Sequence, residues 1–220
     1  MLHTIPGTSV NIGYLVMGSL QNNVYIIDNG ITTFVVDPSC NAEEIIAALD
    51  GKKLDAIVLT HRHHDHVGAA ADLRKATGAT VIASKKDTPI ISGKEPIPHN
   101  TTAFQPCPVD TEVEGGSSLT LGSMVWQVFD TPGHTPGSMC LYMPCNSAGN
   151  GSSTSPLLIS GDTLFSGSIG RTDFPGGSME EMRNSLKQLA NLPDNTFVLP
   201  GHGNFTTIGA ERNRTFSLYI

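Results

Sequence analysis

The sequence predicts an α+β fold in which two β-sheets pack face to face with helices outside, a four-layer αββα sandwich. Short apolar runs of strand length alternate with stretches of helical spacing, in the order strands, helix, strand, helix. The same order then occurs a second time, which indicates two similar halves. At 220 residues the chain is long enough for one sizeable core, and we expect residues 1–220 to form a single domain.

The first half begins with an antiparallel meander, because short apolar runs flank the hairpin-turn pair Asn29-Gly30. Two helices follow, each ended by a glycine, and a nearly all-apolar run between them predicts a buried strand. The predicted strands are residues 12–17, 23–28, 32–36, 54–59 and 80–83, and the predicted helices are residues 39–50 and 67–76. Residues 84–116 are the least regular part of the chain, and we assign no chemistry to them.

The second half has the same kinds of element around a polar insertion. Residues 145–156 are rich in Ser, Gly and Asn and are interpreted as a loop between two strands, not as a domain boundary. The predicted strands begin near Leu119 and include residues 124–129, 139–142, 157–160 and 196–199, and the predicted helices are residues 179–189 and 207–212.

Composition argues against several classes of partner. The net charge is −7 and no run of Lys or Arg could follow a phosphate backbone, so we expect no nucleic acid partner. No window approaches about 20 apolar residues and the N-terminal segment lacks a basic start, so we expect neither a membrane partner nor a targeting segment. The four cysteines form no CxxC pair, which favours a cytoplasmic location. Composition leaves the oligomeric state open.

The segment His61-Arg62-His63-His64-Asp65-His66 offers a cluster of metal ligands directly after a predicted buried strand. Residues two apart in an extended segment point to the same side, so His61 and His63 can reach one ion together. A tightening chain can aim Asp65 and His66 at a neighbouring position. His64 is out of phase with His61 and His63 and is expected at the surface.

Three further candidate ligands follow predicted strands in the second half. His134 lies in the segment Gly133-His134-Thr135-Pro136-Gly137, Asp162 in Gly161-Asp162-Thr163, and His202 in Gly201-His202-Gly203. If these strands share one sheet edge, their loops converge and the candidate ligands meet.

The pattern His61-x-His63-x-Asp65-His66 resembles the H-x-H-x-D-H signature of the metallo-β-lactamase superfamily. The resemblance implies that fold over the whole chain and a two-metal site. It implies that His61, His63 and His134 hold the first metal, that Asp65, His66 and His202 hold the second, and that Asp162 bridges both. We expect two divalent cations per chain, zinc first, with iron or manganese as alternatives that imidazole and carboxylate ligands also accept.

Within that superfamily the sequence looks like the glyoxalase II branch, the hydroxyacylglutathione hydrolases, and in particular its short single-domain bacterial members. The segments that carry this likeness are residues 133–137, 161–165, 170–174 and 200–203. Because the sequence ends at Ile220, we expect the C-terminal helical domain that helps to hold glutathione in full-length glyoxalase II to be missing.

The resemblance implies a metal-dependent hydrolase in which a hydroxide between the two cations attacks a thioester, in S-lactoylglutathione or a related acyl-thiol. Asp65 would also be catalytic, by orienting the attacking water or accepting its proton. Arg171 follows Gly170 just beyond Asp162 and could bind the carboxylate of an acidic thiol. A structural salt bridge from Arg171 to Asp173 or Glu180 is the alternative reading.

Other functions use the same ligands. A persulfide dioxygenase of this fold would hold one iron through His61, His134 and Asp162, and it is the main alternative. A non-catalytic metal-binding protein and an RNA-processing nuclease are lower alternatives, because the ligand set is complete and the charge is acidic. A β-lactamase is disfavoured by the absence of a visible secretory signal and by Asp162 in the bridging position.

Overall fold

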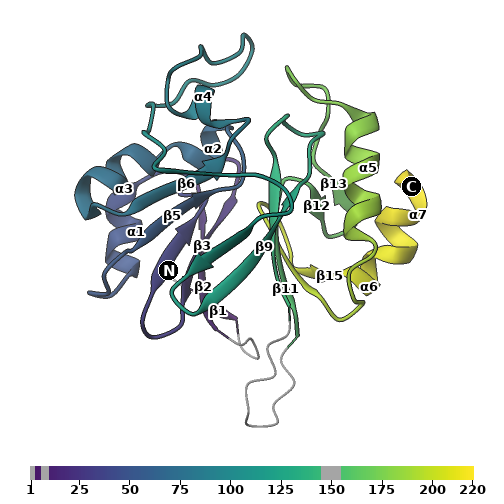
Figure 1. Ribbon diagram of the computed structural model, residues 1–220, viewed down its shortest axis with the longest axis horizontal. Coiled ribbons are helices and arrows are strands. Elements are labelled where there is room, and N and C mark those ends of the chain that lie inside the picture. Colours follow the sequence, from purple (N-terminus) through teal and green to yellow (C-terminus); the bar gives the residue numbers. More distant parts are fainter. Residues whose placement is uncertain (1–2, 6–9, 145–154) are drawn as a thin grey trace.

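The computed structural model describes residues 3–5, 10–144 and 155–220. In these ranges two mixed β-sheets stand side by side, with helices on both outer faces (Figure 1). The first sheet has the strand order β1-β2-β3-β4-β5-β6-β7, and the second has the order β15-β14-β11-β10-β9-β8. The predicted four-layer αββα sandwich is therefore confirmed.

The first sheet carries the first half of the chain and the start of the second. Its strands are β1 (His3–Ile5), β2 (Asn11–Met17), β3 (Asn22–Asp28), β4 (Thr33–Val36), β5 (Ala56–Leu59), β6 (Thr80–Ser84) and β7 (Thr111–Val113). Its helices are α1 (Ala42–Ala48), α2 (His64–Val67), α3 (Ala70–Thr77) and α4 (Thr88–Ile91).

The second sheet carries the remainder. Its strands are β8 (Ser118–Leu121), β9 (Met124–Asp130), β10 (Met139–Met143), β11 (Leu157–Gly161), β14 (Phe197–Pro200) and β15 (Thr206–Thr207), beside a small hairpin of β12 (Leu164–Phe165) and β13 (Ser168–Ile169). Its helices are α5 (Met179–Leu189), α6 (Ile208–Glu211), a π-helix (Arg212–Phe216) and α7 (Ser217–Tyr219).

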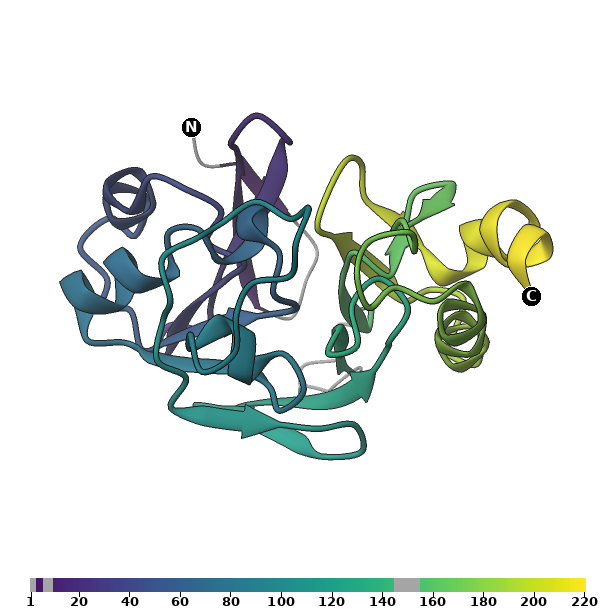
Figure 2. The same ribbon diagram turned by 90° about the horizontal axis from the view of Figure 1, so that it is seen from above.

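Three apolar layers hold the sandwich together. Between the sheets, Phe34 of β4 meets Trp126 of β9 edge to face, with ring centroids 5.9 Å apart. Ile57 of β5 packs on the α1 and α3 side of its sheet, whereas its neighbour Val58 faces the second sheet, which explains why this strand is apolar at every position. On the other side, Leu186 of α5 lies in the layer that covers the second sheet. Figure 2 shows the helices outside both sheets.

The strand directions place several loops at one edge of the sandwich. β4, β5 and β6 pair in parallel, and β11 pairs in parallel with β14. β9 and β11 both pair antiparallel to β10 and therefore run in the same direction. The segments that follow β9, β11 and β14 consequently leave the second sheet at the same end. The segment that follows β5 meets them there, since the N–H of Met139 at the start of β10 donates to the carbonyl of Thr60 at 3.0 Å, between the two halves in Figure 2.

The structure corrects three of the predicted elements. The helix expected at residues 67–76 begins only at Ala70, and Val67 belongs to the separate short helix α2. The interruption is at Ala69, which has φ −98° and ψ 1° and donates its N–H to the carbonyl of Pro38 at 2.9 Å. Residues 84–116 contain α4 and the edge strand β7. The helix expected at residues 207–212 begins at Ile208 and continues into the π-helix. The loop expected at residues 145–156 lies mostly outside the described residues.

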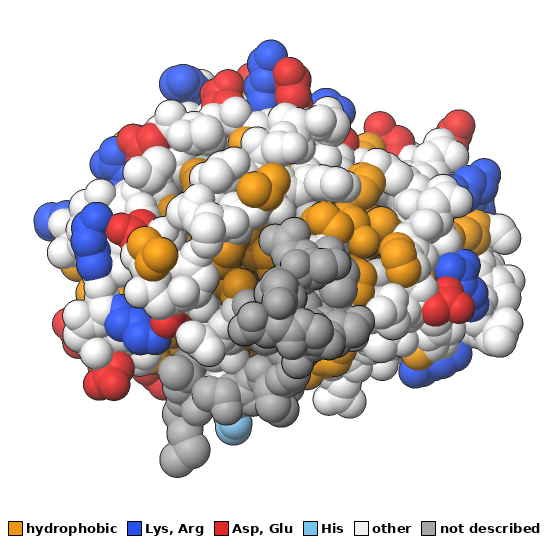
Figure 3. Space-filling view, turned by 60° about the horizontal axis from the view of Figure 1, so that its bottom comes forward, with side chains coloured by type: hydrophobic (Ala, Val, Ile, Leu, Met, Phe, Trp, Pro, Cys, Tyr) orange, Lys and Arg blue, Asp and Glu red, His pale blue; other side chains and the backbone are white. Residues whose placement is uncertain are grey.

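On the face shown in Figure 3, lysine and arginine side chains lie among aspartate and glutamate around the edge, and hydrophobic side chains gather near the middle. This is the lower end of the sandwich in Figure 1, where the strand ends opposite the convergent loops lie. Among the helices of the described residues, none has the length and apolar character needed to cross a bilayer.

The contact between Phe34 and Trp126 generates a stability prediction. Trp126 is 0% exposed, so Trp126→Ala is expected to lower the free energy of unfolding by about 3–5 kcal/mol by leaving a cavity between the sheets. The neighbouring residue Val125 is 45% exposed, and Val125→Ala should cost less than about 1 kcal/mol. Urea unfolding measures both, and equal losses would contradict this account of the core.

Candidate metal centre

His61 and His63 form the first part of the site directly beyond β5. The chain is still extended at His63, with φ −72° and ψ 147°, so the side chains of His61 and His63 project to the same side. One ligand nitrogen from each of these residues and one from His134 lie within 4.8 Å of one another. The structure thus brings together the first predicted group of ligands.

The second group forms because a helix begins at His64. The helical turn of α2 rotates Asp65 and His66 away from the direction of His61 and His63, toward His202. The Nε2 atom of His202 lies 3.2 Å from Asp65 Oδ2 and 3.3 Å from His66 Nε2. One ligand atom from each of Asp65, His66 and His202 lies within 4.8 Å of the other two.

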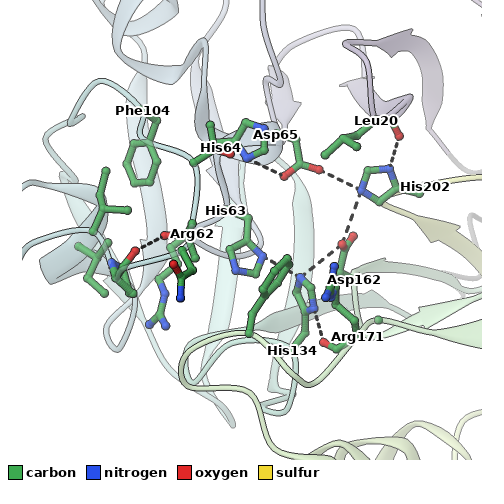
Figure 4. Close-up of a pocket in the computed structure, with 18 of the residues that line it drawn as sticks. Leu20, Arg62, His63, His64, Asp65, Phe104, His134, Asp162, Arg171 and His202 are labelled. Carbon is green, nitrogen blue, oxygen red and sulfur yellow. Dashed lines mark hydrogen bonds and ion pairs between the residues drawn. The ribbon is translucent and has the colours of Figure 1, made fainter.

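Asp162 lies between the two groups (Figure 4). Its Oδ2 atom is 3.4 Å from His134 Nε2, in the first group. The same oxygen is 3.5 Å from His202 Nε2, and Oδ1 is 3.3 Å from His66 Nε2, in the second group. This is the placement that a carboxylate bridging two cations requires.

The three ligands from the second sheet come from convergent strand ends, as predicted. His134 follows β9, Asp162 follows β11 and His202 follows β14. Gly201 allows the close approach of these segments, since a Cβ atom there would collide with the Asp162 carboxylate and the His66 ring. Glycine in the Gly201-His202 pair is therefore a steric requirement of the site.

Hydrogen bonds fix the orientation of three imidazole rings. Nδ1 of His134 donates to the carbonyl oxygen of Arg171 at 2.7 Å, and Nδ1 of His202 donates to that of Leu20 at 2.9 Å. Nδ1 of His66 donates to Asp37 at 2.8 Å. Each bond leaves Nε2 directed at the centre of the site, which is the arrangement that metal-binding histidines usually have.

Sequence reasoning missed Asp37. Its carboxylate accepts the backbone N–H and the hydroxyl of Thr60, both at 2.7 Å, as well as the His66 ring. Asp37 thereby ties the end of β4 to the start of the histidine segment. The available signal was a charged residue at the end of the apolar run of β4, but that pattern alone does not identify its partner.

Sequence reasoning also missed Asp87, which joins two of the ligand-bearing loops. Asp87 is fully buried, and its carboxylate accepts from the guanidinium and backbone N–H of Arg62 at 3.0 and 3.1 Å. It also accepts from the Thr135 hydroxyl at 2.7 Å. Arg62 and Thr135 adjoin the ligands His61, His63 and His134, so this buried ion pair positions the first group of ligands.

The surroundings favour the protonation states in which these groups bind cations. Burial and then the neighbouring imidazoles lower the pKa of His61 well below its usual value, and burial and His134 lower the pKa of His63 to about 3. Burial opposes ionisation of Asp65 and Asp162, but the nearby histidines outweigh it and lower the pKa of both carboxyls.

The pKa values of His66 and His202 move the other way. Burial disfavours their protonation, but for His66 the carboxylates of Asp162 and Asp37 raise the pKa well above its usual value. For His202 the hydrogen bond to Asp65 has the same effect. The carboxylates of Asp65 and Asp162 therefore stabilise positive charge between them. A metal cation at this position can take the place of the protons that His66 and His202 would otherwise bind.

The residues present fit a pair of cations. His61 Nε2 is buried and has no hydrogen-bond partner among the described residues, which is costly unless a ligand takes that position. The two groups supply only imidazole and carboxylate donors. Such donors suit zinc, iron and manganese. The clusters are thus consistent with a binuclear metal site.

The structure places Arg171 and His64 at the same pocket, lined by both together with His63, Asp65, His134, Asp162 and His202. Arg171 is exposed and makes two 2.7 Å bonds to the Asp173 carboxylate, with its guanidinium 3.8 Å from the Phe174 ring centroid. His64 is partly exposed, and its Nδ1 atom lies 3.6 Å from Asp65 Oδ1. Substrate binding by Arg171 stays a prediction.

Comparison with known proteins finds a match over most of the chain. The family model described as "Metallo-beta-lactamase superfamily" matches residues 17–202. An uncharacterized protein of Aquifex aeolicus is 37% identical, covering 81% of this chain and 82% of its own. The probable metallo-hydrolase YqgX of Bacillus subtilis is 32% identical (90% and 92% covered), and hydroxyacylglutathione hydrolase GloC of Haemophilus influenzae is 30% identical (92% and 95%).

Solved structures give the same picture. The crystal structure of the BLEG-1 B3 metallo-beta-lactamase is similar with a TM-score of 0.77 and 32% identity, covering 98% of this chain and 99% of that one. The structure of TTHA1623 in a di-iron-bound form has a TM-score of 0.72 and 34% identity, with 91% and 97% covered. A relative of similar size thus holds two metal ions.

The two ligand groups generate a prediction of metal content. After loading with zinc and removal of free metal, the chain is expected to retain about two ions, and His202→Ala about one, because the second group loses a donor. Elemental analysis against protein concentration gives the ratio.

The matched control is His3→Ala, since His3 is exposed in β1, outside both groups. It should retain two ions. Two ions in His202→Ala, or fewer than two in the His3 control, would contradict the assignment of the second group.

Proposed function

The chain belongs to the metallo-β-lactamase superfamily and has the site of a metal-dependent hydrolase, and we propose that it cleaves the thioester of S-lactoylglutathione or a related acyl-thiol. The observation that carries the proposal is the position of Asp162 between two three-residue ligand groups at one pocket. The 30% identity to hydroxyacylglutathione hydrolase GloC, over 92% of this chain, supports the thioester as the bond.

Two divalent cations would supply a water of lowered pKa and polarise the carbonyl of the substrate. His61, His63 and His134 would hold one cation, Asp65, His66 and His202 the other, and Asp162 both. Zinc is the first choice for this donor set, with iron and manganese as alternatives.

The residues of the chain then orient the water and fix the reacting atoms. Asp65 is held ionised and faces the centre of the site, so its carboxylate can accept a hydrogen bond from the attacking water and orient it. In our proposal it also takes the proton of that water. Asp162 keeps the two ligand groups at a fixed separation. His134 is held by the Arg171 carbonyl, which couples the first group to the loop that carries Arg171.

A nucleophile from the protein is not needed for this reaction. Burial raises the pKa of the Cys107 and Cys140 thiols to about 11, so both are protonated and weakly reactive at neutral pH. The described cysteines Cys40, Cys107 and Cys140 are all unpaired, which supports our further proposal of a cytoplasmic location. We propose a small molecule as the partner, in preference to nucleic acid or membrane.

Hydrolysis of a β-lactam amide is a second candidate. The specific observation in its favour is the 32% identity and 0.77 TM-score to the BLEG-1 B3 metallo-beta-lactamase. Both reactions add water to an acyl carbonyl, and they differ in the leaving group. A chromogenic cephalosporin assayed beside the thioester distinguishes them.

Zinc-loaded protein is expected to hydrolyse S-lactoylglutathione. Asp65→Asn should lower kcat by about 10²–10⁴-fold, because the amide cannot accept a proton from the water. Release of free thiol measures the rate, and elemental analysis of the variant separates this role of Asp65 from loss of metal. Asp72→Asn, on the exposed face of α3, is the matched control and should retain full activity.

The alternatives predict other outcomes. Oxygen uptake with glutathione persulfide by protein that holds one iron per chain would replace the hydrolase with the mononuclear-iron dioxygenase. A fully metal-loaded protein that turns over none of these substrates would favour a non-catalytic metal-binding role.

The ion pair of Arg171 generates a separate prediction. Arg171→Ala should raise KM for S-lactoylglutathione about three- to tenfold with little change in kcat, because an exposed charge-assisted contact to a carboxylate is lost. Asp173→Asn should lower KM for the same substrate, because it frees the guanidinium from its present partner. Steady-state kinetics with both variants measures the effect, and unchanged KM values would remove Arg171 from the binding site.

A further inference from the structure

The pocket that contains the metal site extends past it along the segment between α4 and β7. Four apolar residues of this region line it, Ile90, Ile97, Pro98 and Phe104, and we call them the apolar wall. The pocket has a volume of about 480 Å³, within the range of small-molecule sites. In Figure 4, Phe104 lies on the opposite side of His63 from Arg171 and His202.

The apolar wall is anchored to the core. Ile91, next to Ile90 in α4, is fully buried in the layer between the first sheet and its helices, and Phe104 packs against that layer. The backbone N–H of Cys107 donates to the carbonyl of Ile91 at 2.9 Å, which ties the two ends of the segment together. The apolar wall is therefore held in place by the core of the protein.

The charges around the pocket make the wall suitable for an apolar group. Arg62 is committed to Asp87 and to the carbonyl of Pro175, and Arg171 lies on the other side of His63 from Phe104, away from the wall. The other residues that this segment contributes to the pocket are neutral, Asn100, Thr101 and Thr102. A charged group placed along the wall would lose hydration without gaining a partner, whereas an alkyl chain would be removed from water.

We propose that the substrate carries an apolar chain that lies along the apolar wall while its thioester is at the metal site. This proposal rests on the thioester hydrolase function. The reaction adds one water across the carbon–sulfur bond: the acyl carbon gains the oxygen and the sulfur leaves as a thiol, so a carboxylate, a thiol and one proton result. The chain can belong to the acyl or to the thiol half, and two substrate series distinguish these cases.

The first series consists of acyl thioesters of N-acetylcysteamine with two to eight acyl carbons, and the second of alkyl thioacetates with two to eight alkyl carbons. In the series whose chain meets the wall, kcat/KM is expected to rise about three- to fourfold with each methylene until the wall is covered. Ile97→Asn should lower the ratio of kcat/KM for the eight-carbon to the two-carbon substrate by about tenfold. Ile97→Leu, which keeps an apolar side chain of the same size, should retain the wild-type ratio.

Ile31→Asn is the matched control, because Ile31 is 83% exposed at the hairpin between β3 and β4, outside the pocket. It should leave the ratio unchanged. Hydrolysis that does not depend on chain length in either series, or a ratio that Ile97→Asn leaves unchanged, would overturn the apolar wall and leave the thioester function intact.

A binding measurement separates the two proposals if no thioester is cleaved. Calorimetric titration of the zinc-loaded protein with S-butyl- and S-octyl-N-acetylcysteamine, thioethers that cannot be hydrolysed, reports the chain without turnover. If the octyl compound binds more tightly than the butyl compound and Ile97→Asn removes the difference, an apolar chain binds at the apolar wall even though no thioester is cleaved. Equal affinities overturn the wall.

Discussion

The buried carboxylate of Asp162 is the point on which the rest of the site depends, because it faces both groups of ligands at once. His134 lies on one side of it, and His66 and His202 lie on the other. Five imidazoles and two carboxylates gathered without a cation would repel one another or remain poorly solvated. The arrangement is stable as a receptor for positive charge, and the surrounding structure serves to hold it in that form.

That structure joins the two sheets through polar contacts at their common edge. Asp37 binds the start of the histidine segment to the end of β4, and Asp87 binds Arg62 to the loop that carries His134. Both carboxylates are buried and fully engaged, so the ligands stand on a rigid base. The apolar layer between the sheets, which contains Phe34 and Trp126, holds the two sheets in a fixed position relative to each other.

The candidate metal site and the rest of the pocket are built from different kinds of structure, strand ends in the first case and an irregular connection in the second. His134, Asp162 and His202 each follow the end of a strand of the second sheet, so the sheet fixes their positions. The segment that carries Ile97 and Phe104 is an irregular connection, where changes of sequence are tolerated more readily. The candidate metal ligands therefore lie at the edge of the sheets, and the apolar wall that we propose for substrate binding lies in the loop beside it.

Most of the strands and helices and the types of the metal ligands could be predicted from the sequence alone, because hydrophobic periodicity and the chemistry of a motif are local properties. The strands that precede His61, His134 and Asp162, and the boundaries of α5, could be predicted directly. The contacts of Asp37 with His66, 29 residues apart, and of Asp87 with Arg62, 25 residues apart, became visible only in the folded chain. The tertiary structure also turned residues 88–104, which predicted no chemistry, into a wall of the pocket. The partners of buried charges and the linings of cavities depend on which distant segments fold together, and a local sequence pattern does not contain that information.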